Sequence, residues 1–162
     1  MAKAASPALP LNESILRSFD IHCRATACLV GQLEPAAWRA ATPDGKGRDV
    51  AALAAHVHSV HCMWLKAAGS PKVPEALDKS TVTPAQAAAA LAETASLLRS
   101  LIAKALEGDG RIKSFKPDVT AFVAYLIAHD SHHRGQMSML ARQTGHSLSK
   151  SANFRLWEWG VM

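Results

Sequence analysis

The sequence has no framework of cysteines. Cys23, Cys28 and Cys62 are an odd number of thiols, they lack the spacing of metal-ligand pairs, and all three fall in predicted helices. This pattern favours neither a disulfide-stapled fold nor a structural zinc site with several cysteine ligands. We therefore expect reduced thiols.

Long apolar runs are also missing. The first ten residues contain Lys3 but no apolar stretch of signal-peptide length, and no uninterrupted apolar stretch is long enough to span a bilayer. The sequence therefore predicts a soluble, cytoplasmic protein that has no membrane partner.

The chain has only a small excess of one charge sign. It contains 18 Lys and Arg against 13 Asp and Glu, a formal net charge of +5. The excess is dispersed, apart from Arg111, Lys113 and Lys116 in one predicted loop, so we expect no nucleic-acid partner.

What is present indicates one globular domain. Hydrophobic residues make up 49% of the 162 residues and charged residues 19%, which is enough for a sizeable core. Residues 1–11 are rich in Ala and Pro and are predicted to form a flexible leader. Residues 12–162 then form the domain, with no internal repeat and no convincing strand.

Apolar residues recur at helical spacing in four segments. The third begins at the capping sequence Thr83-Pro84-Ala85-Gln86 and ends before Gly108, whereas Gly145 follows the fourth. The predicted helices cover residues 12–33, 48–68, 83–107 and 118–143. Four long helices predict an all-α protein, most simply a four-helix bundle.

The C-terminal tail, residues 146–162, is unusually apolar. It carries Phe154, Leu156, Trp157 and Trp159. So much apolar mass in a short segment predicts that the tail docks on the bundle, with a helical turn.

Two histidines stand out in the last predicted helix. His129 and His133 are four residues apart, so on a helix their imidazoles project from one face and can reach one cation. That face is apolar, and His132 lies at its margin, about 60° away. Two inward imidazoles one turn apart are costly without a shared ligand, which favours a metal site.

The second predicted helix supplies a third candidate. His56 lies on one narrow stripe with Leu53 and Val60, whereas His58 and His61 point elsewhere, towards a neighbouring helix, a partner subunit or water. A single inward histidine is more often a hydrogen-bonded core residue than a ligand. Three imidazoles from two facing helices would instead form a half-open site for a divalent ion, with one position left for water or substrate.

The sequence His129-Asp130-Ser131-His132-His133-Arg134-Gly135-Gln136 resembles the H-x-x-H-H-R-G-Q signature of the DinB/YfiT-like superfamily. His56 followed by Trp64, and the ending Leu156-Trp157-Glu158-Trp159, are similar to other parts of that family. The resemblance covers most of the chain.

This resemblance implies a four-helix bundle with a long crossover connection, commonly a homodimer. It also implies a divalent metal ion held by His56, His129 and His133. Zinc or nickel is the expected ion, although imidazole ligands alone do not identify it. Asp130 and His132 are candidates to orient the ligands through hydrogen bonds, and Gln136 either lines the cavity or packs between helices.

Two functions are consistent with these features. The first is a metal-dependent enzyme whose ion activates water or a low-molecular-weight thiol, for hydrolysis or S-transfer on a small-molecule substrate. The second is a non-catalytic, metal-binding dimeric helical module with a stress-related role. No general acid or base stands out in the sequence.

Overall fold

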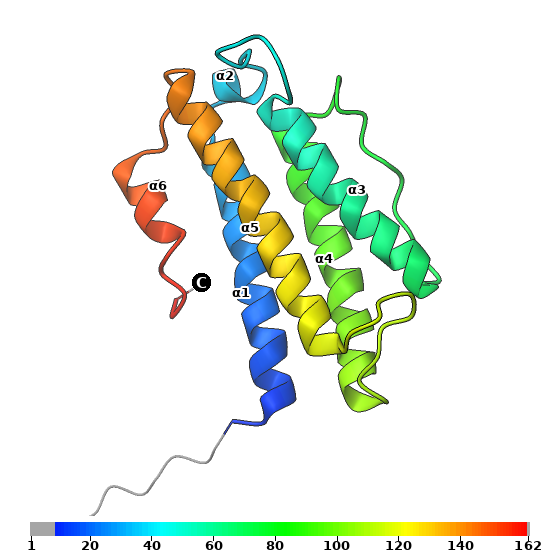
Figure 1. The fold of residues 1–162 in the computed structure, drawn as a ribbon. Coiled ribbons are helices and arrows are strands. Elements are labelled where there is room, and N and C mark those ends of the chain that lie inside the picture. Colours follow the sequence, from blue (N-terminus) through cyan, green and yellow to red (C-terminus); the bar gives the residue numbers. More distant parts are fainter. Residues whose placement is uncertain (1–8, 162) are drawn as a thin grey trace, which may run out of the picture.

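Six helices make up the regular structure of residues 9–161, the part of the chain that this computed structural model describes (Figure 1). Most of the predicted leader, residues 1–8, lies outside the described residues. The helices are α1 (Leu11–Gln32), α2 (Pro35–Trp38), α3 (Val50–Ala68), α4 (Pro84–Glu107), α5 (Val119–Gln143) and α6 (Lys150–Arg155).

Side-chain caps explain where three of the long helices begin. The carboxylates of Asp49 and Asp118 accept hydrogen bonds from backbone N–H groups at the start of α3 and α5. At the start of α4, Thr83 and Gln86 form the predicted capping box, in which each side chain bonds the other residue's backbone N–H. Gly145 follows α5 with a φ of 87°, a backbone conformation that favours glycine.

The four long helices form a bundle with a long crossover. Both α1 and α3 pack against α4 and α5, so α1 and α3 occupy opposite corners. Residues 69–83 run back along the bundle between α3 and α4 (Figure 1), which makes these two neighbours parallel. The predicted all-α bundle and its crossover are thus confirmed. Within residues 9–161, no helix has the length and apolarity needed to cross a membrane.

The bundle core consists of two apolar clusters with a polar layer between them. One cluster surrounds Leu29, Val57 and Met137, and the other surrounds Phe19 and Leu98. Each of the four long helices contributes buried polar residues to the level between the clusters. These residues are His22, Thr26, His58, His61, Thr94, Asp130 and His133.

The tail docks on the bundle with a short helix, as predicted, but few of its apolar side chains take part. Ala152 of α6 is buried and Leu156 packs against the apolar cluster around Leu29, so the segment does contact the bundle. Phe154 and Trp157, however, are 74% and 79% exposed. A helix of six residues offers only one inward face, and here small or aliphatic side chains occupy it while the aromatic ones point outward.

Thr83→Ala is expected to lower the free energy of unfolding by about 1 kcal/mol, because the substitution removes the hydroxyl that accepts from the Gln86 N–H. Urea unfolding followed by circular dichroism measures the change. Thr83→Ser keeps the hydroxyl and should remain close to the unaltered protein. Equal stability of the Ala and Ser variants would contradict this assignment.

Candidate metal centre

Three histidines meet where α3 faces α5. His56 comes from α3, and His129 and His133 come from successive turns of α5. One ring nitrogen of each lies within 4.8 Å of the corresponding nitrogens of the other two. The ring centroids are 4.6 Å apart for the pairs His56–His133 and His129–His133, and 5.4 Å apart for His56–His129. This histidine triad is only partly covered, so solvent can reach it.

Hydrogen bonds fix the ring orientation of two members of the triad. His129 Nδ1 lies 2.9 Å from Asp130 Oδ1, and His133 Nδ1 lies 2.7 Å from Gln136 Oε1. A carboxylate or amide oxygen only accepts, so each Nδ1 carries the hydrogen and donates it. In both neutral rings the lone pair is therefore on Nε2, where a metal ion would need it.

Asp130 is the centre of a buried network behind the triad. Its Oδ2 accepts hydrogen bonds from His22 Nε2 at 3.1 Å and from His61 Nε2 at 2.9 Å. The other ring nitrogen of His61 lies 2.9 Å from the hydroxyl of Thr94 on α4. One carboxylate thus joins side chains from all four long helices.

Arg134 completes the network on the side of α1. Its Nη1 donates to His22 Nδ1 at 3.2 Å and to Thr26 Oγ1 at 3.0 Å, and its Nη2 donates to Ser131 Oγ. Because arginine has no acceptor, His22 must present a lone pair at Nδ1 and a hydrogen at Nε2. His22 is therefore neutral and donates to Asp130.

These contacts keep Asp130 ionised. Burial raises the pKa of this carboxyl, but hydrogen bonds from His129, His22 and His61 outweigh that effect and hold the pKa well below its usual range. Burial is also the main cause that lowers the pKa of His56 and His133. The charge of Arg48 adds to this effect at His56, whereas at His133 the hydrogen bond with Gln136 partly opposes it. Both shifts favour the neutral form of His56 and His133, the form that can bind a cation.

An aromatic cluster borders the triad on one side. The ring of Tyr125 stacks on His129, with centroids 6.1 Å apart, and Trp64 contacts Tyr125 edge to face. Phe115 and Phe122 complete the cluster. These side chains give the triad an apolar wall.

The structure brings together the three histidines that the sequence singled out. Asp130 orients His129 through a hydrogen bond, as expected, and Gln136 orients His133. His132 is exposed and packs against the ring of His133 outside the triad, with centroids 5.0 Å apart.

Sequence reasoning missed the network behind the triad. His61 faces neighbouring helices, the first of the three surroundings expected for it, but its two partners there, Thr94 on α4 and Asp130 on α5, were not identified. His22 was not considered, although it lies three residues after Phe19 and four before Thr26 on the inward stripe of α1. That spacing was the signal that could have identified it.

Comparisons with known proteins agree with the motif. The sequence model of the DinB family matches residues 8–157, which include the triad and the network. Neither the curated proteins nor the solved structures contain a match to this chain.

The metal-free protein is expected to lose stability as the pH falls from about 7 to about 5. His56, His58 and His133 have folded-state pKa values below the ordinary 6.5. At pH values between these folded-state pKa values and 6.5, the unfolded chain binds more protons than the folded chain. Lowering the pH through this range therefore favours unfolding. Urea unfolding at several pH values measures the urea concentration at which half of the protein is unfolded. This midpoint should decrease as the pH decreases. His58→Gln should make this dependence shallower, and a midpoint that stays constant or rises would contradict the account.

Proposed function

This chain belongs to the DinB family, and on that premise we propose that it is a metal-dependent enzyme in which His56, His129 and His133 hold a divalent ion. The observation that carries the proposal is the convergence of three imidazole nitrogens within 4.8 Å. Two of these rings have Nε2 freed by hydrogen bonds at Nδ1. We propose zinc or nickel, both of which imidazole ligands suit.

The donor set fits a catalytic site better than a closed structural one. Three neutral ligands leave the charge of the ion uncompensated and leave a fourth position open. An ion in this setting supplies Lewis acidity, which lowers the pKa of a water molecule or a thiol that reaches it. In hydrolysis the nucleophile is water, and in S-transfer it is a low-molecular-weight thiol.

The protein's own contribution is to orient the ligands and to exclude water from one side. Asp130 and Gln136 hold two rings in the tautomer that presents Nε2. Tyr125 stacks on His129 and, with its aromatic neighbours, closes that side. A small-molecule substrate would therefore approach from the side away from the aromatic cluster.

One observation favours a second candidate function, a non-catalytic dimeric metal-binding module. Phe154 and Trp157 are large apolar side chains left exposed on the tail. An exposed apolar patch is typical of an interaction site, and a second copy of this chain is the partner proposed here.

Alanine in place of His56, His129 or His133 is expected to leave the purified protein with less than about one tenth of its bound metal, because each removes one of three ligands. Elemental analysis after dialysis against zinc or nickel measures the content. Gln136→Leu should retain the site but weaken affinity by about 10–100-fold. His132→Ala is the matched control and should keep full metal content. A His133→Ala protein that also keeps it would show that the ligand set is wrong.

The metal-loaded protein is expected to turn over substrate either without any added thiol or only when a thiol is added. Electrophilic and ester substrates are assayed with and without glutathione or cysteine, with a chelator-treated sample as the control. Turnover only with thiol supports S-transfer, and turnover in water alone supports hydrolysis. Activity that survives chelation, or silence under all conditions, would contradict the metal-dependent enzyme, and silence would favour the dimeric module.

A further inference from the structure

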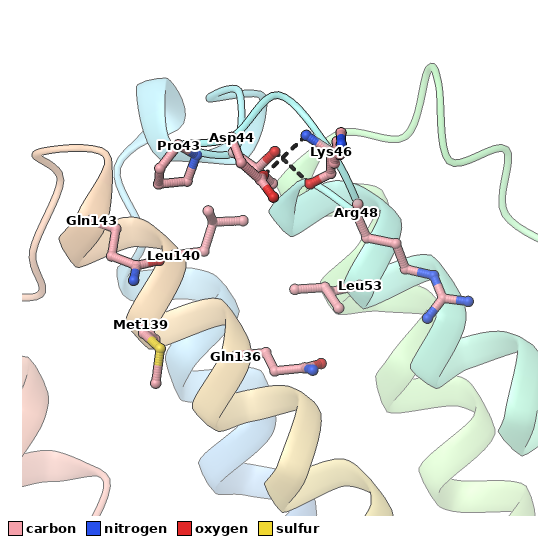
Figure 2. A pocket seen from close by; sticks show the side chains of 11 residues that line it. Pro43, Asp44, Lys46, Arg48, Leu53, Gln136, Met139, Leu140 and Gln143 are labelled. Carbon is pink, nitrogen blue, oxygen red and sulfur yellow. Dashed lines mark hydrogen bonds between the residues drawn. The ribbon is translucent and has the colours of Figure 1, made fainter.

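A cleft of about 640 Å³ opens beside the histidine triad, between the start of α3 and the last turns of α5 (Figure 2). Small-molecule sites have volumes of roughly 300–1,000 Å³. Gln136, which holds the ring of His133, lines this cleft. Leu53, also in the lining, lies one helical turn before His56. A ligand in the cleft would therefore lie next to the triad.

The lining of the cleft carries one net positive charge. Lys46 and Arg48 come from the loop that leads into α3, and Asp44 is the one acidic residue of the lining. Asp44 accepts a hydrogen bond from the Lys46 backbone N–H at 3.0 Å, so its carboxylate already has a partner in the loop (Figure 2). The two cations and the one carboxylate leave one positive charge, which a bound monoanion would balance.

Arg48 is the cation that is available and close to the triad. Among the interactions of residues 9–161, no ion pair involves this guanidinium, which is exposed. Arg48 lines the same cleft as Gln136, whose side-chain oxygen accepts a hydrogen bond from His133 Nδ1 at 2.7 Å, so the guanidinium and the triad border one space. A guanidinium can pair with a carboxylate through two parallel hydrogen bonds.

Apolar side chains line the cleft from both helices, Leu53 from α3 and Met139 and Leu140 from α5. Leu53 and Leu140 are nearly buried there, and Met139 is 52% exposed (Figure 2). An exposed methionine offers a flexible, polarisable surface that adapts to ligands of different shape. The cleft thus combines an unpaired cation, apolar side chains from both helices and the amide of Gln136 beside the triad.

We infer that this cleft binds an amphipathic organic monoanion, a carboxylate whose charged group pairs with Arg48 and whose apolar part lies against Leu53, Met139 and Leu140. The inference rests on the proposed function in so far as this ligand is the substrate, because its uncharged end then extends past Gln136 towards the triad. The substrate class is then that of carboxylates that carry an apolar group.

The test is calorimetric titration of the full-length, metal-free protein with 4-phenylbutyrate and with its neutral amide. Metal-free protein is used so that the carboxylate cannot be held by an ion. The protein should bind the carboxylate at least about tenfold more tightly than the amide. Arg48→Met should reduce this preference to less than about twofold. Lys104→Met, which removes one positive charge from the exposed face of α4, is the matched control and should keep it.

Equal binding of carboxylate and amide, or a preference that survives Arg48→Met, would overturn the inference, as would loss of the preference in Lys104→Met. Metal content is measured separately on the same proteins, and Arg48→Met should retain it. A protein that holds metal but shows no carboxylate preference would refute the cleft and leave the metal centre standing. A carboxylate preference in a protein that binds no metal would refute the metal centre and support the cleft.

Discussion

The structure depends on one buried carboxylate. Asp130 is 2% exposed and accepts hydrogen bonds from three imidazoles, those of His22, His61 and His129. A buried charge without such partners costs several kcal/mol, so the partners must be in place for the bundle to form. The same carboxylate sets the tautomer of His129. The same contacts therefore serve both the folding of the bundle and the orientation of the histidine triad.

This constraint explains the layered core. The polar level interrupts what would otherwise be one apolar interior and separates the cluster around Leu29 from the cluster around Phe19. A hydrogen bond to a charged group contributes about 1.5–3 kcal/mol, so the loss of any one partner of Asp130 is costly. Polar residues at this level consequently fix the register of the four long helices as well as serving the site. The histidine triad lies partly exposed between α3 and α5, whereas the network behind it is buried among the four long helices.

The sequence predicted what local spacing determines. The positions of His129 and His133 one turn apart, the capping box at Thr83 and the inward stripe through His56 each depend on residues close in the chain. The contacts of Asp130 with His22 and His61 join residues 108 and 69 positions apart, and they depend on which helices become neighbours. Helical periodicity does not contain that information. The tail docks as its apolar composition predicted, but composition does not say which side of a six-residue helix faces the bundle.

The central claim is that three imidazoles, oriented by Asp130 and Gln136, hold a divalent ion and leave one position exchangeable. X-ray absorption spectroscopy of the zinc-loaded protein measures the ligands directly. The account predicts three histidine nitrogens at about 2.0–2.1 Å and one further light-atom ligand that is replaced by sulfur when a thiol is added. A fixed set of four protein ligands, or sulfur ligation by the protein's own cysteines without added thiol, would contradict it.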